Sequence, residues 1–280
     1  MVTNISEGHL VHLKNLKEVQ AAKGELFDSL SEQETAIVNA DDPLVLELAK
    51  SVRAKVVTYG IHNKADIKAE NIIPMNREGF KLSVRFFDKN IPVCIPFLGE
   101  CNIYNALAAM AASWSLGVPP DDIKRGLMNA KLLASRFEVS EYGGITVIND
   151  SYNANPKSMK EALKILSNYK CKGRRFFIIG DMLELGDFAE PAHKTLGIEI
   201  TKYSIDYLVT VGELSAHVAK SAVDSGMNKK HIATTSGHEC AVAFIQKYSR
   251  AGDCLLVKGS RGSKMEEVVK RLAVNKLEND

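Results

Sequence analysis

Three apolar stretches in the second half of the chain are each followed at once by polar residues. Residues 150–156 read DSYNANP, residues 180–186 read GDMLELG and residues 258–262 read KGSRG. These runs carry carboxylates, carboxamides, a lysine and an arginine, which are groups that bind phosphates, hydroxyls and carboxylates. One such run is by default a polar loop that caps a helix. Three runs on one rim of a sheet favour a ligand site instead.

The pattern around these runs predicts βαβ units, in which a mostly parallel sheet carries helices on both faces. The apolar stretches are expected to be strands at 145–149, 175–179, 206–211, 231–235 and 254–257. Helical spacing lies between them at 156–169, 188–203, 214–225, 238–249 and 263–274.

The first half of the chain has a mixed pattern. Residues 65–97 alternate apolar and polar, which is typical of antiparallel strands. Residues 2–5 resemble the end of a strand, so the chain is expected to begin inside a domain. The domain boundary is predicted near 131–135. The other expected elements are helices at 14–30, 43–52, 102–116 and 120–130 and strands at 35–39 and 55–59.

The composition excludes several classes of protein. Among 280 residues, 36 Lys and Arg oppose 34 Asp and Glu, so no strong field attracts nucleic acid or an anionic membrane. The five cysteines are odd in number and form no CxxC pair, which favours a reducing cytoplasm over a disulfide framework or a zinc site. The start of the chain does not have the pattern of a signal peptide, and the longest apolar stretch, around 105–117, is too short to span a bilayer.

The 280 residues contain neither a GxxxxGK[ST] phosphate loop nor a GxGxxG motif. Residues 259–264 (GSRGSK) have the composition of a phosphate loop without its spacing. A self-sufficient P-loop nucleotidase is therefore not expected.

Some single residues have two interpretations each. His9 follows Glu7 in a predicted loop and is either structural or a ligand of metal or phosphate. Lys23 is by default a solvated helix lysine. Asn102 and Asn105 begin a helix, where they cap it or contact a base. Arg136 lies at the predicted hinge and either clamps a phosphate or makes a surface ion pair worth roughly 0–1 kcal/mol.

Taken together, these motifs resemble the Mur ligase family, the ATP-dependent amide ligases of peptidoglycan precursor synthesis. The matches occur in family order over nearly the whole chain. DSYNANP and GDMLELG are most specific to the branch that adds D-alanyl-D-alanine. The other matching stretches are TNI at 3–5 with HL at 9–10, AKGE at 22–25, NADDP at 39–43, GECNIYNALAA at 99–109, SRFE at 135–138 and KGSR at 258–261.

The resemblance implies an α/β protein with an incomplete central ATPase domain at 1–133 and a Rossmann-like C-terminal domain at 134–280. The family's sugar-binding domain, its phosphate loop and an acidic residue near its magnesium would lie upstream. The first domain is thus expected to lack strands and to expose an apolar sheet edge, whereas the second is expected to fold alone.

The resemblance also implies a reaction that uses ATP and Mg²⁺. ATP phosphorylates the terminal carboxylate of UDP-N-acetylmuramoyl-tripeptide, and the amine of D-alanyl-D-alanine attacks the acyl phosphate. His9 would lie at the magnesium. Lys23 matches a lysine that is carbamylated in the family, which turns a cation into a metal ligand. Arg136 would reach the ATP phosphates and completes the expected catalytic set.

The remaining roles are likewise implied by the resemblance. Asn102 and Asn105 match positions near the adenine, and Asp150 would bind the ribose hydroxyls. Two departures from the family pattern occur: Cys101 replaces a usual histidine, and the residues around His9 differ, which affects one nucleotide contact and one loop. The expected lining of the pocket for the dipeptide and the peptide end is Asn153, Asn155, Asp181, Glu184, Lys258, Ser260 and Arg261.

The leading hypothesis is therefore a D-alanyl-D-alanine-adding ligase that is inactive as this chain alone, because it has no phosphate loop. A separate chain that carries the missing N-terminal half is a candidate partner. One alternative is a non-catalytic fragment that binds nucleotide or peptide. The other is a folylpolyglutamate-synthetase-like ligase, which shares the architecture but not the DSYNANP and GDMLELG runs.

Overall fold

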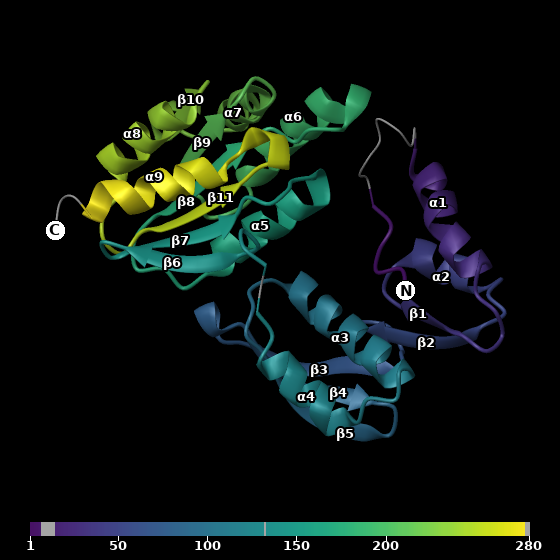
Figure 1. The fold of residues 1–280 in the computed structure, drawn as a ribbon. Helices are drawn as coiled ribbons and strands as arrows, with labels where there is room; N and C mark the ends of the chain where they lie inside the picture. Colours follow the sequence, from purple (N-terminus) through teal and green to yellow (C-terminus); the bar gives the residue numbers. More distant parts are fainter. Residues whose placement is uncertain (7–14, 132, 278–280) are drawn as a thin grey trace. The chain divides into compact units, whose positions relative to one another are not determined.

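The computed structural model describes residues 1–6, 15–131 and 133–277, with the side chains of 275–277 left out. It divides into two compact units, one ending at Lys131 and one made of the described residues after 132 (Figure 1). The seven strands predicted outside 65–97 are confirmed to within one residue at either end.

In its described part the first unit contains a five-stranded sheet in the order β1-β2-β3-β4-β5. β1, β2 and β3 run parallel, whereas β3, β4 and β5 pair antiparallel. The predicted alternation is confirmed, because Leu82, Val84 and Phe86 are buried between more exposed neighbours. The strands are β1 (Thr35–Asn39), β2 (Lys55–Gly60), β3 (Ile67–Pro74), β4 (Phe80–Phe86) and β5 (Lys89–Ile95).

Small and apolar residues let α3 pack closely on β1, β2 and β3. α2 begins at Pro43, after the Asp42 carboxylate has accepted the backbone N–H groups of Leu44 and Val45. It ends at Ala49, three residues before its predicted end. The helices of this unit are α1 (Leu16–Asp28), α2 (Pro43–Ala49), η1 (Asn76–Glu78), α3 (Glu100–Ser115) and α4 (Pro120–Met128).

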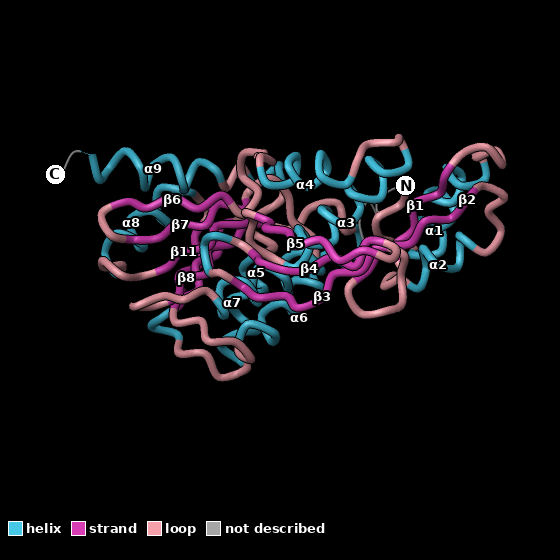
Figure 2. The backbone as a smooth tube through the Cα atoms, turned by 90° about the horizontal axis from the view of Figure 1, so that it is seen from below, coloured by secondary structure: helices cyan, strands magenta, loops and turns pink. Residues whose placement is uncertain are grey.

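The described part of the second unit forms a six-stranded sheet in the order β10-β9-β8-β11-β7-β6. All neighbours are parallel except β6 and β7. Figure 2 shows β6, β7, β11 and β8 following one another across this sheet. The strands are β6 (Glu138–Tyr142), β7 (Ile145–Asp150), β8 (Arg175–Gly180), β9 (Tyr207–Val211), β10 (Ile232–Thr235) and β11 (Cys254–Lys258).

Both faces of this sheet are covered, so its central strands are apolar without alternation. Phe176 and Ile178 face the core that α8 and α9 close, whereas α5 and α7 pack against other strand positions. No described helix is both long and apolar enough to cross a bilayer. The helices are α5 (Pro156–Asn168), η2 (Gly186–Phe188), α6 (Ala189–Ile200), α7 (Ser215–Asp224), η3 (Lys229–His231), α8 (His238–Tyr248), η4 (Arg261–Ser263) and α9 (Glu266–Leu277).

The strand β6 was not predicted from the sequence. It is a polar, half-exposed edge strand, so it lacks the apolar pattern of its neighbours. Gly143 and Gly144 join it to β7 with φ of 52° and 73°, the positive values that a tight hairpin requires. This Gly-Gly pair was the available signal.

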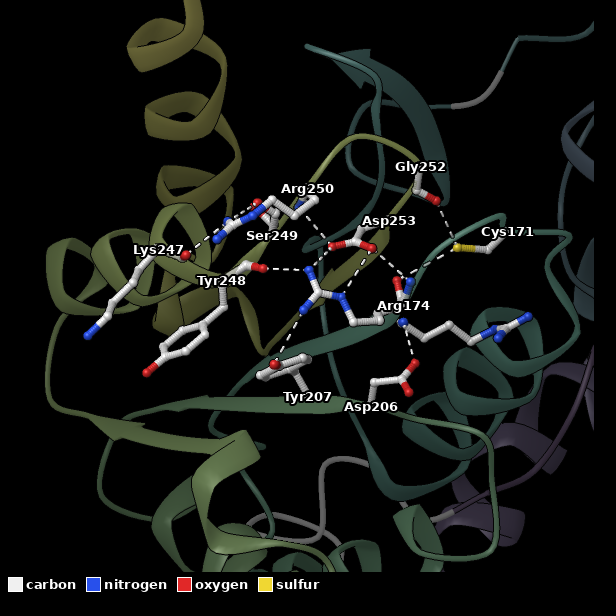
Figure 3. Close-up of polar contacts among 11 residues, drawn as sticks. Cys171, Arg174, Asp206, Tyr207, Lys247, Tyr248, Ser249, Arg250, Gly252 and Asp253 are labelled. Carbon is white, nitrogen blue, oxygen red and sulfur yellow. Dashed lines mark hydrogen bonds and ion pairs between the residues drawn. The ribbon is translucent and has the colours of Figure 1, made fainter.

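At the edge of the sheet where β8 and β11 begin, Asp253 organises a polar network (Figure 3). Its Oδ1 accepts the Arg174 backbone N–H at 2.7 Å, and its Oδ2 accepts Arg174 Nη2 at 2.9 Å and the Arg250 backbone N–H at 2.8 Å. The Asp253 side chain is 3% exposed. Only glycine fits at position 173, because a Cβ there would lie 2.3 Å from Asp253 Oδ1.

Replacing Asp253 with alanine should destabilise the second unit by about 3 kcal/mol, because buried donors lose a charged acceptor. Urea unfolding followed by circular dichroism measures this change. Asp224→Ala, at an exposed helix end, is the matched control and should stay within about 0.5 kcal/mol of the parent. Equal stability of the two variants would contradict the structural role of Asp253.

Candidate functional site

The three polar runs meet on one rim of the second sheet, as predicted. They follow β7, β8 and β11, which are parallel neighbours with β11 in the middle. In register, Lys258 lies opposite Asp150 on one side and Ile179 on the other. The chain order of the strands differs from their spatial order, yet all three ends point to the same edge.

A pocket of about 330 Å³ opens between these loops. Five residues predicted for it lie in its wall, whereas the contribution of Tyr152, Leu183 and Leu185 was missed, although all three belong to the quoted motifs. The pocket combines two carboxamides, a carboxylate, two hydroxyls and a guanidinium with apolar side chains. Its lining is Tyr152, Asn153, Ala154, Asn155, Leu183, Glu184, Leu185, Ser260, Arg261 and Gly262.

Asp150 and Lys258 form a buried ion pair and are not part of the pocket lining. Lys258 Nζ lies 2.5 Å from Asp150 Oδ2 and 2.9 Å from the Asn153 carbonyl oxygen. Burial raises the pKa of Asp150, and the charges of Lys258 and Arg136 oppose this effect. The pair therefore supports the pocket indirectly, because Lys258 holds the loop that carries Asn153.

Asp181 also differs from its predicted position in the pocket wall. Its Oδ1 accepts the Ser215 backbone N–H at the start of α7, at 2.7 Å. Gly212 gives room for this carboxylate, because a Cβ there would lie 2.5 Å from Asp181 Oδ1. The side chain thus joins β8 to α7.

The hydroxyl of Ser260 connects the three loops. Its Oγ accepts the Leu183 backbone N–H at 2.9 Å and donates to the Ala154 carbonyl at 3.2 Å. Ser260 itself is 4% exposed. Asn155 has a further structural task, because its side chain caps α5 by accepting the Ser158 backbone N–H.

His193 supports the loop after β8 and was not predicted from the sequence, where nothing set it apart. It is fully buried on α6, and its Nε2 accepts the Met182 backbone N–H at 3.0 Å. Its Nδ1 lies 2.6 Å from the Ala189 carbonyl, so the neutral ring carries its proton there. Burial lowers the pKa of His193, which keeps the ring neutral. Glu184, two residues after the Met182 that His193 holds, has a φ of 63°.

Arg136 lies at the start of the second unit beside this pocket. Its exposed guanidinium carbon is 4.1 Å from the centre of the Tyr152 ring. The Tyr152 backbone N–H donates to the Ser135 carbonyl, and Asn149 Nδ2 donates to Ser135 Oγ. The structure therefore attaches this arginine to the DSYNANP loop.

In the first unit the NADDP run holds the segment that leads toward His9. Asn39 Nδ2 donates to the Thr3 carbonyl at 2.9 Å, and Asp42 Oδ2 accepts the Ile5 backbone N–H at 2.9 Å. Lys23 Nζ donates to the Asn4 carbonyl at 2.7 Å. His9 itself lies outside the described residues. Val2 forms one parallel bridge with Val38, the only part of the predicted strand end that is seen among residues 1–6.

Asp41 joins a second group of segments. Its carboxylate accepts the backbone N–H groups of Ile61, His62 and Asn63 at 2.5, 3.0 and 2.7 Å. It also accepts the Tyr104 hydroxyl of α3 at 2.9 Å. These four donors lower the pKa of Asp41 although burial opposes them.

The same helix carries the two predicted adenine residues. Buried Asn102 donates from Nδ2 to the Leu98 carbonyl at 2.7 Å, and exposed Asn105 donates to Asn102 Oδ1 at 3.1 Å. The described residues contain no group of three or more His, Cys, Asp or Glu that would hold a metal. The magnesium roles of His9 and Lys23 thus remain predictions.

Asp41→Ala should leave four donors without the carboxylate that they share and should destabilise the first unit by about 2–3 kcal/mol. Hydrogen exchange should show the amides of Ile61, His62 and Asn63 losing protection before the rest of the sheet does. Asp88→Ala, in an exposed turn of the same unit, serves as the control. Unchanged protection of those three amides would contradict the role assigned to Asp41.

The lowered pKa of His193 predicts a pH dependence of stability. Below the ordinary pKa of 6.5 the unfolded chain binds the proton more readily than the folded chain, so stability falls as the pH drops through this value toward the folded pKa. The urea midpoint should fall between about pH 7.5 and 5.5. His193→Gln, which retains an acceptor for Met182, should reduce that slope, whereas exposed His62→Gln should keep it. The idea fails if both variants keep the full slope.

Each of the two units matches a known protein-family model. Residues 1–113 match the family model described as the Mur ligase middle domain. Residues 135–261 match the model described as the Mur ligase glutamate ligase domain.

Two similar curated proteins are named UDP-N-acetylmuramoyl-tripeptide–D-alanyl-D-alanine ligase. The one from Bacillus subtilis is 33% identical over 278 residues, which is 99% of this chain and 59% of that protein. The one from Escherichia coli is 34% identical over 278 residues, which is 98% of this chain and 60% of that protein.

The fold is similar to a crystal structure of MurF from Acinetobacter baumannii, with a TM-score of 0.86 at 27% identity. This match covers 97% of the present chain and 58% of the other. The chain therefore spans less than two thirds of the length of its relatives. On the evidence of both matching domains and of these relatives, the chain belongs to the Mur ligase family.

Proposed function

We propose that this chain supplies the middle and C-terminal parts of a cytoplasmic ligase that joins D-alanyl-D-alanine to UDP-N-acetylmuramoyl-tripeptide. The observation that carries the proposal is the name of both relatives, which align over nearly the whole chain. In this proposal residues 1–133 belong to the ATP-binding domain and residues 134–280 to the C-terminal domain.

The proposed reaction has two steps. The γ-phosphoryl group of ATP passes to the terminal carboxylate of the tripeptide, which gives an acyl phosphate and ADP. The amine of D-alanyl-D-alanine then attacks the acyl carbon, loses a proton and displaces phosphate, which leaves an amide. Positioning and charge neutralisation supply most of the catalysis in such a transfer.

The pocket of the second unit suits the incoming dipeptide. We assign the Glu184 carboxylate to its ammonium group, and Asn153, Asn155 and Ser260 to its amide and the peptide end. Arg261 adds a cation to this wall. Arg136 remains assigned to the ATP phosphates.

The first unit is assigned to the nucleotide. Asn102 and Asn105 are proposed to face the adenine, with Asn105 the exposed member of the pair. We also assign Asp150 of the second unit to the ribose hydroxyls. Lys258 donates to one of its two carboxylate oxygens.

Magnesium would neutralise the phosphate charge. Lys23 fits the proposed site, because its Nζ lies against the Asn4 carbonyl, in the segment that leads to His9. Carbamylation would convert Lys23 into an oxygen ligand for the metal.

One observation favours a second candidate, a non-catalytic binding module. The 280 residues contain no phosphate loop, and the loss of even one donor to a developing charge costs about 3 kcal/mol. In the main proposal the sugar-binding domain and the phosphate loop lie outside these 280 residues, and a separate chain that carries them can be supplied.

The test is product formation from Mg-ATP, UDP-N-acetylmuramoyl-tripeptide and D-alanyl-D-alanine, followed by mass spectrometry. We expect no product from the chain alone and product after co-expression with a chain that carries the missing parts. Arg136→Ala should lower the restored rate at least about 100-fold, the scale of one lost cation at a developing charge.

Folded proteins that form no product in either arrangement would support the binding module. A parallel reaction with folate and glutamate covers the folylpolyglutamate-type alternative. Turnover there and not with the peptide substrates would replace the main proposal.

A further inference from the structure

Two guanidinium groups from distant parts of the second unit meet at the ring of Tyr152. The guanidinium carbon of Arg136 lies 4.1 Å from the ring centre, and that of Arg261 lies 5.4 Å from it. Arg136 precedes β6, Tyr152 follows β7 and Arg261 follows β11. Both arginines are exposed and Tyr152 is 37% exposed, so the group is accessible to solvent.

The backbone holds Arg136 in place at some conformational cost. Its neighbours Ser135 and Phe137 have φ of 62° and 51°, a region that non-glycine residues seldom occupy. Such strain persists only where surrounding contacts enforce it. The Tyr152 backbone N–H supplies one of these contacts, at 3.1 Å from the Ser135 carbonyl. Tyr152 thus fixes both the backbone beside Arg136 and its guanidinium.

Arg261 is fixed from another direction. It begins η4 directly after Ser260, whose hydroxyl bonds the loops of Leu183 and Ala154. Arg261 and Tyr152 both line the pocket. The two arginines therefore approach one ring from two anchored loops.

We propose that Tyr152 is a positioning residue that sets Arg136 and Arg261 at one shared phosphoryl site. A guanidinium on an aromatic face keeps the N–H groups in its plane free to donate. The two guanidinium carbons lie no further apart than the sum of their distances to the ring centre. N–H groups that extend past the edge of the ring can then donate from both arginines to one phosphoryl group beside the ring. Two like charges at this spacing favour a ligand with two negative charges.

The inference deepens the proposed function, since the shared group would be the phosphoryl in transfer. It changes the role of Arg261, which the dipeptide pocket alone would assign to a carboxylate. Glu184 lines the same pocket. Tyr152 itself takes no part in the chemistry.

Nuclear magnetic resonance of the full chain with labelled arginine tests the proposal without any ligation. Ring currents should displace the side-chain signals of Arg136 and Arg261 in the parent and in Tyr152→Phe. Inorganic pyrophosphate, added without magnesium, should shift both signals with a single Kd. Tyr152→Leu should abolish the ring-current displacement and weaken pyrophosphate about tenfold.

The Arg271 signal, from a residue of α9 that is paired with Glu239 of α8, is the internal control. Tyr203→Leu controls for the loss of a tyrosine and should bind like the parent. Pyrophosphate that moves only one arginine, or that binds Tyr152→Leu as tightly as the parent, would overturn the shared site. If Tyr152→Leu does not fold, the joint response in the parent and in Tyr152→Phe still decides the question. Failure of ligation would leave this result intact, so the two proposals fail separately.

Discussion

The buried pair of Lys258 and Asp150 is the interaction on which the candidate site depends. It joins the ends of β11 and β7, and Lys258 also holds the carbonyl of Asn153 in the pocket wall. Removal of one partner from such a pair leaves an unpaired buried charge, which costs about 3–5 kcal/mol. A pair of this kind therefore specifies one arrangement of loops. The start of the second unit depends on the same carboxylate, because Asp150 accepts the Phe137 backbone N–H beside Arg136.

A second set of polar side chains holds the loops that form the pocket. Ser260 connects three loops, His193 supports the loop after β8, and Asp181 joins that loop to α7. Each is at least half-buried and each bonds backbone groups, so the loops of the rim keep their shape without regular structure. Arg261 and Glu184, by contrast, are exposed and lie in the pocket wall.

In the first unit, too, polar side chains connect segments that are distant in the sequence. Adjacent carboxylates in NADDP act on different segments, since Asp42 holds residue 5 and Asp41 holds residues 61–63 and Tyr104. The helix that carries Asn102 and Asn105 is thereby joined to the ends of two strands. A mutation at Asp41 would therefore disturb the helix that carries Asn102 and Asn105.

The sequence by itself determined the strands other than β6, most helices, the rim on which the three motifs meet, and the family. It could do so because apolar runs, caps and motif spacing are local patterns. Only the tertiary structure decided which rim residues face the pocket. Asp150, Asp181 and Lys258 have the composition of binding groups, yet Asp150 and Lys258 are buried against each other and Asp181 bonds the start of α7. The roles of His193 and Tyr152 escaped prediction because they follow from contacts across the fold that no local pattern encodes. The edge strand β6 was missed because it is polar and half-exposed, although Gly143 and Gly144 were a local signal for its hairpin.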